Sequence, residues 1–352
     1  MTAKYREIAY KLEVELRRMR SEGRTKLPTE TELCSMFTCS RQTVRAALDD
    51  LAQRGLIVKR KGSGSYLAGS IADRSSKVFL IIEDEDEYTN PSFISRLRQM
   101  LKDRKYELIC RSTGGLISGE AEILSELQQE QPAAVIIEPL NNVIPNPNIS
   151  MICRLHEEGI PVIYFRTSYP GPSEAPLIGE DNKEGPAILV RHLKEHGHIN
   201  IAGIFRCDDS RGLMRYQGFY EALGDANLPF DEGGVLMITS GDRRRIMQGD
   251  EGLLTRFVND NLRGRSAVIC QNDEMAFRLM RVLNNRGIRV PEDVAVVSFD
   301  DSYYASSAGI TSLGHSNRNM SSIVSDQVTA AIEHKRIPEV RISWRLSVRN
   351  SG

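Results

Sequence analysis

The sequence lacks a cysteine pattern, a long apolar run and a phosphate-binding loop, and each absence excludes a class of protein. Its six cysteines stand singly, with no Cys-x-x-Cys pair and no histidine at ligand spacing, so we expect buried free thiols rather than a metal site or a disulfide framework. No stretch approaches the ~20 apolar residues that cross a bilayer, and none follows Met1. We therefore expect neither secretion nor a membrane partner, and we place the protein in the cytoplasm.

Signals of catalysis are also scarce. The chain has no Gly-Lys motif of the P-loop type, and its six histidines lack a Ser or Cys partner in an activated-nucleophile arrangement. A GxGxxG turn is missing after the strand expected to end at Ile82, where the acidic residues Glu83 to Glu87 stand instead. The sequence therefore predicts a protein that is not an enzyme and that carries neither a metal nor another cofactor.

The charges are divided unevenly along the chain. The 352 residues carry a formal net charge of −1, but residues 1–70 hold 14 Lys and Arg against 8 Asp and Glu, and the remainder holds 32 against 39. Only the N-terminal part is therefore suited electrostatically to nucleic acid, because affinity for a DNA backbone comes from neutralising its phosphates. A chain of this length also suits two or three domains rather than one.

The stretch from Leu27 to Leu67 has the pattern of a DNA-reading domain, and an amphipathic helix over residues 4–22 is expected to pack behind it. Thr29 and Glu32 form a capping box, which predicts the start of a short helix. Two short helices joined by a tight turn make a helix-turn-helix. The second helix is capped by Ser40, and its buried stripe at i, i+3, i+4 and i+7 consists of Val44, Ala47, Leu48 and Leu51.

The exposed face of this second helix is basic and polar in its first turns. It carries Arg41, Gln42 and Arg45, and the N-terminal residues of a recognition helix are those that meet base edges. Arginine pairs with guanine, and glutamine with adenine, through two hydrogen bonds. The alternative for such a face is a solvated helix surface. However, residues 56–67 then indicate a hairpin with the basic run 59–61 near its tip, which is a wing that reaches DNA backbone or minor groove.

These residues resemble the winged helix of GntR-type regulators. The resemblance rests on Lys4-Tyr5, Leu27-Pro28-Thr29-Glu30, Glu32-Leu33, Ser40-Arg41-Gln42-Thr43-Val44-Arg45, Leu51, Gly55-Leu56 and Gly62-Ser63-Gly64-Ser65-Tyr66. It implies a winged helix-turn-helix domain over residues 1–68 that binds double-stranded operator DNA. The DNA contacts that it implies are Lys4, Tyr5, Glu30, Arg41, Gln42, Thr43, Arg45, Lys59, Lys61 and Ser63.

A linker and a second domain follow. Residues 69–76 are mostly small and polar and show no periodic pattern of apolar residues, which indicates a linker. Alternation of strand and helix beyond it implies parallel sheets with helices on both faces and ligands at the carboxyl ends of the strands. The strands are too many for one small sheet, so we expect two subdomains with a cleft between them. The expected strands are 78–82, 107–110, 133–137, 161–165, 201–205, 235–238, 267–270 and 294–299.

The second domain resembles the effector domain of LacI/GalR regulators. The motifs are Asp181-Asn182 with Gly185, His192-Leu193, Gly197-His198, Arg215, Gly218-Phe219, Asn272-Asp273-Glu274, Ala276, Val290-Pro291-Glu292-Asp293-Val294 and Phe299-Asp300-Asp301. The resemblance implies an α/β domain over residues 77–352 with the type I periplasmic-binding-protein fold, in which two doubly wound parallel-sheet subdomains bind a small effector. It also implies a homodimer.

A GntR-type head on a LacI/GalR-type body is similar to the AraR group of arabinose-responsive repressors. The residues that carry this similarity are Ile136-Ile137-Glu138-Pro139, Gly203-Ile204-Phe205, Asp208-Asp209, Asn272-Asp273-Glu274 and Asp300-Asp301-Ser302. L-Arabinose is therefore the effector that the resemblance implies. The residues by themselves indicate only a small polar ligand.

Candidate effector-binding residues lie at or just beyond the carboxyl ends of the expected strands. The resemblance favours Arg215, Asn272 and Asp300, and Asp181 and Glu138 hold equivalent positions. A sugar cleft needs such carboxylates, amides and arginines, because each sugar hydroxyl both donates and accepts hydrogen bonds. The alternative role of these side chains is helix capping or an internal ion pair, and it is strongest for Asp181.

Two further arginines, Arg166 and Arg206, directly follow expected strands and should also face the cleft. Together with Arg215 they could clamp a carboxylate or a phosphate through paired hydrogen bonds, which a neutral pentose does not require. A sugar acid or sugar phosphate therefore stays open as the effector beside a neutral sugar. His315 follows a short strand and is expected to border the hinge.

The function expected from these observations is a dimeric transcriptional repressor that a sugar releases from its operator. A two-fold protein reads two half-sites, and closure of an effector cleft changes the relative placement of the two DNA-binding heads. A transport-type sugar-binding protein is the alternative among binding proteins. The winged helix and the missing signal peptide argue against it.

Overall fold

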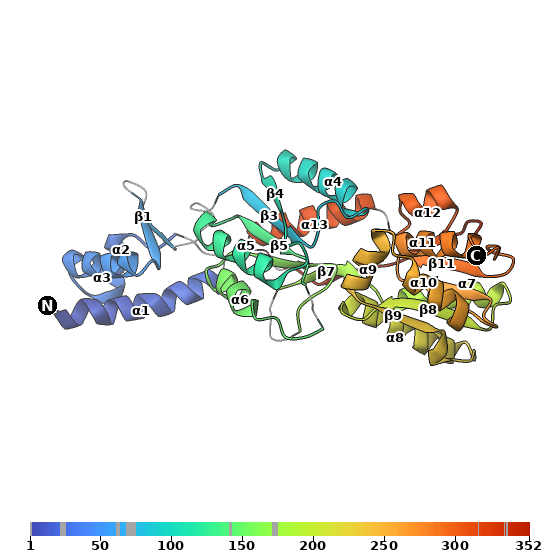
Figure 1. Cartoon of the computed structure of the whole chain (residues 1–352). Helices are drawn as coiled ribbons and strands as arrows, with labels where there is room; N and C mark the ends of the chain where they lie inside the picture. Colours follow the sequence, from blue (N-terminus) through green and yellow to red (C-terminus); the bar gives the residue numbers. More distant parts are fainter. Residues whose placement is uncertain are drawn as a thin grey trace.

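The computed structural model describes residues 2–21, 26–60, 64–67, 75–140, 143–170, 175–315, 317–333, 335 and 337–352. Figure 1 shows three bodies in a row. The winged-helix head lies at one end, a first α/β subdomain lies in the middle, and a second α/β subdomain with the C-terminus lies at the other end. Of the expected linker over residues 69–76, only residues 75 and 76 are among those described.

The head has the predicted local signals at its helix starts. In the capping box, the backbone nitrogen of Thr29 donates to Glu32 Oε2 at 2.7 Å, and that of Glu32 donates to Thr29 Oγ1 at 3.3 Å. Ser40 caps the next helix by accepting from the backbone nitrogen of Thr43. The apolar stripes of the three helices form one buried core, so the predicted winged helix-turn-helix is confirmed. Its elements are α1 (Thr2–Ser21), α2 (Glu30–Phe37), α3 (Arg41–Gln53), β1 (Ile57–Arg60) and β2 (Gly64–Leu67).

The first subdomain is a parallel sheet of six strands in the order β13-β7-β6-β5-β3-β4. Helices α4 and α13 cover one face and α5 and α6 cover the other, because their buried side chains fall in two separate apolar clusters. The elements are β3 (Lys77–Ile82), α4 (Asn90–Asp103), β4 (Glu107–Ser112), α5 (Ile117–Glu130), β5 (Ala134–Ile137), α6 (Ile149–Glu157), β6 (Val162–Phe165), β7 (Leu177–Glu180), α13 (Asn317–Ile332) and β13 (Val340–Ile342).

The second subdomain has a similar six-stranded sheet in the order β14-β12-β11-β10-β8-β9, in which all strands but β14 run parallel. Helices α7 and α8 cover one face, and α9 to α12 cover the other. The elements are α7 (Glu184–Glu195), β8 (Ile201–Arg206), α8 (Ser210–Asp225), η1 (Glu232–Gly234), β9 (Val235–Ile238), α9 (Ser240–Met247), α10 (Gly252–Arg256), η2 (Phe257–Asn261), β10 (Ala267–Cys270), α11 (Asp273–Asn284), β11 (Ala295–Phe299), α12 (Tyr303–Ala308), β12 (Thr311–Gly314) and β14 (Arg345–Ser347).

The chain crosses between the two subdomains three times. It leaves the first subdomain after β7, which ends at Glu180, returns after β12 at His315, and leaves again after β13 at Trp344. The crossings lie against one another: the indole nitrogen of Trp344 donates to the backbone oxygen of Asp181 at 2.6 Å, and its ring lies 5.8 Å from that of His315. These three segments form the hinge, and the prediction that His315 borders it agrees with its position.

All eight expected strands are present, but the expected alternation of strand and helix is interrupted between β6 and β7, where no helix is described, and again near the C-terminus. There β13 and β14 follow α13 with no helix between them, and β14 runs antiparallel to β12. These late strands are short and carry polar residues, so they lack the apolar runs that marked the others.

Two further expectations concern composition. Of the six cysteines, which are all free, Cys270 is buried and the other five are partly exposed, so the expectation of buried thiols holds for Cys270 alone. Among the described residues, no helix has the length and apolar character needed to cross a bilayer.

Candidate functional site

A cleft between the two subdomains is lined by residues at the carboxyl ends of both sheets. It consists of two adjoining cavities, of about 50 and 160 Å³, that share Arg206, Asp209 and Arg211. The smaller, inner cavity reaches the hinge residues Glu180 and His315. The cleft thus has the place that the fold predicts for a ligand site, at the ends of strands and between domains.

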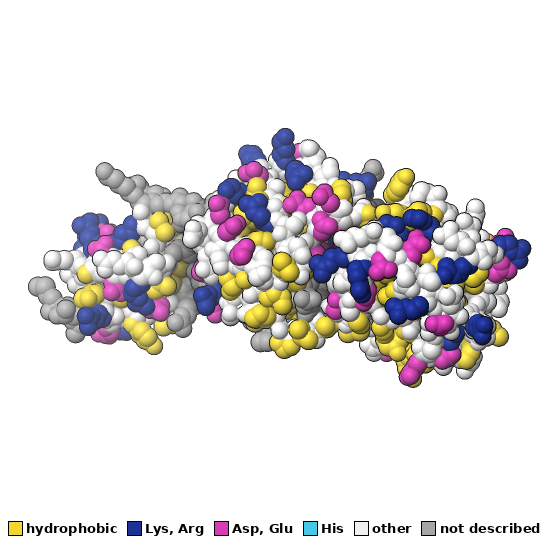
Figure 2. Space-filling model, viewed as in Figure 1, with side chains coloured by type: hydrophobic (Ala, Val, Ile, Leu, Met, Phe, Trp, Pro, Cys, Tyr) yellow, Lys and Arg dark blue, Asp and Glu magenta, His cyan; other side chains and the backbone are white. Residues whose placement is uncertain are grey.

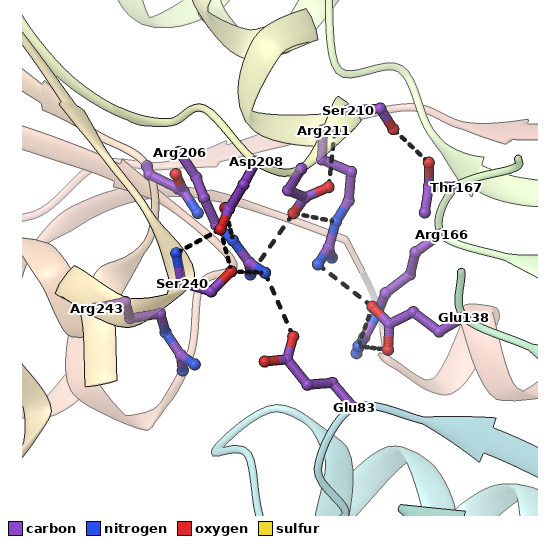
Figure 3. A network of polar contacts seen from close by, with 12 residues as sticks. Glu83, Glu138, Arg166, Thr167, Arg206, Asp208, Ser210, Arg211, Ser240 and Arg243 are labelled. Carbon is purple, nitrogen blue, oxygen red and sulfur yellow. Dashed lines mark hydrogen bonds and ion pairs between the residues drawn. The ribbon is translucent and has the colours of Figure 1, made fainter. Parts of the chain in front are cut away.

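Ion pairs join the subdomains across this cleft (Figure 3). The hydroxyl of Tyr88 in the first subdomain also donates to Asp300 in the second. In the ion pairs, guanidinium groups of the second subdomain contact carboxylates of the first. The pairs are Arg206–Glu83 at 3.4 Å, Arg211–Glu138 at 3.3 Å and Arg243–Glu87 at 3.0 Å.

Carboxylates within each subdomain complete the pairing of these arginines. Arg166 Nη1 lies 3.2 Å from Glu138 Oε2, Arg206 Nε lies 3.0 Å from Asp208 Oδ1, and Arg211 Nε lies 3.3 Å from Asp209 Oδ2. Burial by itself lowers the pKa of Arg211, but Asp209 and Glu138 outweigh it and leave the pKa well above the usual value. Burial raises the pKa of Asp209, yet the charges of Arg211 and Arg206 leave it lowered. Both groups are therefore charged near neutral pH.

Arg215 projects from α8 into the inner cavity under tight packing. Its Nε donates to Asn182 Oδ1 at 3.0 Å, another of its nitrogens donates to the backbone oxygen of Gln271, and its guanidinium lies 4.2 Å from the ring centre of Phe299. Asp300 Oδ1 lies 3.9 Å away. Burial lowers the pKa of Arg215, and the charge of Asp300 offsets that effect only in part.

Asp300 reaches the cavity from a strained turn at the end of β11. Its φ of +103° and the φ of +46° at Asp301 lie in a region that L-residues seldom occupy, at a cost of roughly 1–3 kcal/mol each. The buried carboxylate of Asp273 braces this turn by accepting from the Ser302 backbone nitrogen at 2.6 Å and from the Ser312 hydroxyl at 2.6 Å. The same Ser312 oxygen accepts from the backbone nitrogen of Asp301 at 3.0 Å.

The structure brings five of the seven candidate effector residues together in the inner cavity: Arg166, Arg206, Arg215, Asn272 and Asp300. Asn272 also caps α11 through its Oδ1. Glu138 lines the adjoining outer cavity. Asp181 lines neither of these but a third cavity, of about 470 Å³, which shares Arg166, Glu180 and Arg211 with the inner one. Its Oδ1 accepts from the backbone nitrogens of Lys183 at 3.1 Å and Glu184 at 3.0 Å. Its contacts are those of the alternative role, helix capping.

Several cleft residues were not predicted. Arg211 and Arg243 lie in the first turns of helices that follow β8 and β9, so the rule that found Arg206 could have found them. Glu83 and Glu87 belong to the acidic run after β3, whose sequence indicated only that a nucleotide site is absent there. Among the described residues, no group of three His, Cys, Asp or Glu side chains is placed to hold a metal ion.

In the head, the candidate base-reading arginines lie beside a carboxylate. Arg41 and Arg45 approach Glu30 Oε2 at 3.2 and 2.9 Å, and both arginine side chains remain more than half exposed. Gln42 is exposed next to them, and the hydroxyls of Thr43 and Ser40 lie 2.7 Å apart. The three helix residues and Glu30 thus share one surface of the head.

The other candidate DNA contacts are less fully described. Lys59 on the wing strand lies 2.7 Å from Asp49 Oδ1, and the Tyr5 hydroxyl accepts from Arg6 Nε at 3.4 Å. Lys61, Ser63 and the side chain of Lys4 lie outside the described residues. Figure 2 shows lysine and arginine side chains exposed over the head.

Comparison with known proteins identifies both parts. The profile described as "Bacterial regulatory proteins, gntR family" matches residues 4–67, and the profile "Periplasmic binding protein-like domain" matches residues 190–351. The fold and these matches give the chain a GntR-type winged-helix head and a periplasmic-binding-protein-like body, as the motifs predicted, and the body is similar to that of LacI/GalR regulators. Its relatives are transcription regulators and not enzymes, which confirms that prediction.

The chain is similar over most of its length to two proteins named "Arabinose metabolism transcriptional repressor". The one from Halalkalibacterium halodurans is 28% identical over 88% of this chain and 84% of that protein. The one from Geobacillus stearothermophilus is 28% identical over 93% and 91%. Solved structures of the same fold include the regulator CelR with cellobiose (TM-score 0.67, 24% identity, 89% of this chain and 92% of that one) and CcpA of Lactococcus lactis (0.68, 19%, 79% and 99%).

Proposed function

We propose that the protein represses genes of sugar utilisation and leaves its operator when a neutral sugar, L-arabinose, binds in the cleft. Residues 1–68 bind DNA, residues 69–76 link the parts, and residues 77–352 bind the effector and hold a homodimer together in the cytoplasm. The names of the two relatives similar over most of the chain support arabinose. The cellobiose complex of a regulator with this fold supports a sugar.

The observation that carries a neutral effector is the pairing of charge in the cleft. In the part of the chain that the structure describes, each arginine lining the inner cavity lies within 4 Å of a carboxylate. An anionic ligand would have to displace these buried carboxylates or lie beside them, and a buried charge left without its partner is costly. A polyhydroxy ligand instead adds hydrogen bonds and leaves the pairs intact.

The mechanism follows from where the cleft lies. Its walls belong to different subdomains, so a ligand that contacts both has different affinities for open and closed arrangements and shifts the balance between them. In a dimer, this changes the spacing of the two heads relative to half-sites about one helical turn, or a multiple of it, apart. Binding of the effector then lowers the affinity for the operator, and binding of the operator lowers the affinity for the effector by the same factor.

A thermal-shift screen combined with operator-release measurements tests the proposal. The full-length protein is mixed with L-arabinose, other pentoses, hexoses, aldonic acids and sugar phosphates, and a ligand at 100 times its dissociation constant should add ~2.7 kcal/mol of stability. We expect L-arabinose to stabilise the protein and to release DNA. Stabilisation and release by a sugar acid or sugar phosphate alone would establish the alternative function, a regulator of acidic sugar metabolism.

A further inference from the structure

Four buried polar atoms of residues that line the inner cavity have no hydrogen-bond partner among the described residues, and one of them, Arg211 Nε, lies 3.3 Å from Asp209 Oδ2 in an ion pair. The other three are Glu180 Oε2, Gln271 Oε1 and His315 Nδ1, whose residues all line that cavity. The side chain of Glu180 is 6% exposed, that of His315 is 13% exposed, and Gln271 is 8% exposed. A buried polar group left unpaired costs about 1–3 kcal/mol, and more if it is charged, so three in one cavity point to a ligand.

The chemistry of these atoms defines what the ligand must supply. Burial raises the pKa of Glu180, but His315, Arg211 and Arg166 outweigh it and leave the pKa lowered, so the carboxylate is ionised and can only accept. The amide oxygen of Gln271 can also only accept, and His315 Nδ1 donates or accepts according to its tautomer. The ligand must therefore donate at two points or more. Hydroxyl groups do so, whereas ionised carboxylates and phosphates only accept.

Two of these residues belong to the hinge itself. Glu180 ends β7 at the first crossing between the subdomains, and His315 follows β12 at the second. His315 Nε2 lies 3.9 Å from Glu180 Oε1, so the two crossing segments already contact each other through these side chains. A ligand bound to both would act directly on the segments that bend.

We propose that Glu180, Gln271 and His315 bind hydroxyl groups of the effector and set its specificity, and that Glu180 and His315 connect the effector to the hinge. This inference rests on the proposed function, since it takes the effector to be a neutral sugar in the cleft. The predicted residues Glu138 and Arg166 then have a different part. They are already paired with each other and hold the walls of the cleft in place.

The test compares Glu180→Gln and His315→Gln with the matched control Glu120→Gln in the full-length protein. Glu120 is also fully buried, but its carboxylate accepts from Asn146, Asn148 and Tyr169 and lines neither cavity. Binding of L-arabinose is measured by calorimetry. A hydrogen bond to a charged group contributes enough that losing it weakens binding roughly 10- to 100-fold, which we expect for Glu180→Gln. Glu120→Gln should lower the melting temperature and leave the dissociation constant within about two-fold.

A thermodynamic cycle with monodeoxy pentoses separates direct contact from general damage. The wild type should bind one deoxy analogue roughly 10- to 100-fold more weakly than L-arabinose, whereas Glu180→Gln should distinguish the two only slightly, because the missing hydroxyl had bound Glu180. If the wild type binds pentoses and both hinge variants bind them equally well, the inference is overturned and the proposed function stands. If the wild type binds no neutral sugar, the proposed function fails, and the inference fails with it.

Discussion

The buried carboxylate of Asp273 should make the second subdomain less stable as the pH rises, and replacing it by asparagine should remove that dependence. Asp273 is fully buried and accepts hydrogen bonds from the Ser298 hydroxyl, the Ser312 hydroxyl and the Ser302 backbone nitrogen. Burial, and after it the charge of Asp300, raises its pKa from 3.8 to about 6, although these hydrogen bonds oppose the shift. The folded protein therefore binds this proton more tightly than the unfolded chain does.

The sign and size of the effect follow from linkage. Below about pH 4 the group is protonated in both states, and its full contribution to stability is present. Between about pH 4 and pH 6 the unfolded chain loses the proton first, so the free energy of unfolding falls as the pH rises. A shift of about two pKa units corresponds to about 3 kcal/mol, since each unit is worth 1.36 kcal/mol. The amide of the Asp273→Asn variant is neutral throughout this range and contributes no such slope.

Urea unfolding measures this difference. Trp344 is the single tryptophan of the chain and packs against Phe299 in the second subdomain, so its fluorescence follows the part of the molecule that contains Asp273. The stability of the wild type relative to Asp273→Asn should fall by about 3 kcal/mol between pH 4 and pH 7. Taking this difference cancels the carboxylates that both proteins share. Parallel pH profiles for the two proteins would refute the reasoning.

Further predictions concern the head and the cleft. Arg45→Ala should lower discrimination between operator and altered sites by about 1–3 kcal/mol. Lys59→Ala should instead weaken binding to all duplexes alike and reduce the slope of log affinity against log salt concentration by about one. Gel-shift titrations with both variants measure this, and an equal loss of specificity in the two variants would contradict it. Asp300→Ala should keep DNA affinity and lose the response to L-arabinose in an operator-release titration, and release at the wild-type sugar concentration would exclude Asp300 from the site. Leu51→Ala, at a fully buried position of α3, should destabilise the head by about 2–5 kcal/mol in calorimetry without changing sugar affinity.

Much of the fold could be predicted because its signals are local. The capping box of Thr29 and Glu32 is complete within four residues, and the core strands are apolar runs that need no partner to be recognised. Strands β12, β13 and β14 were harder, because residues such as those of Thr311–Gly314 become strand only through pairing with β11 and β14. That pairing joins segments far apart in the sequence.

Part of the candidate site could be predicted from the sequence, because one rule relates the ends of parallel strands to a ligand cleft. Residues just beyond the carboxyl ends of strands face the cleft, which located Arg166 and Arg206, whereas Arg215, in the second turn of α8, was located by the family resemblance. The sequence could not predict which carboxylates pair with the arginines of the cleft, because Glu83 and Glu87 approach from the other subdomain. The sequence therefore left an anion clamp open, whereas the structure places those arginines beside carboxylates.

Burial decides what these arginine–carboxylate pairs allow in each half of the molecule. In the head, the side chains of Arg41 and Arg45 are 65% and 60% exposed, so their pairs with Glu30 contribute only about 0–1 kcal/mol. A guanine that offers two hydrogen bonds is worth roughly 1–3 kcal/mol of discrimination, enough for a correct base to draw an arginine away from Glu30. In the cleft, the side chain of Arg166 is 9% exposed, and breaking such a buried pair costs about 3–5 kcal/mol. We therefore expect such pairs to exchange for base contacts at the proposed DNA surface and to stay intact in the cleft, with the proposed effector bound around the arginines rather than in place of their carboxylates.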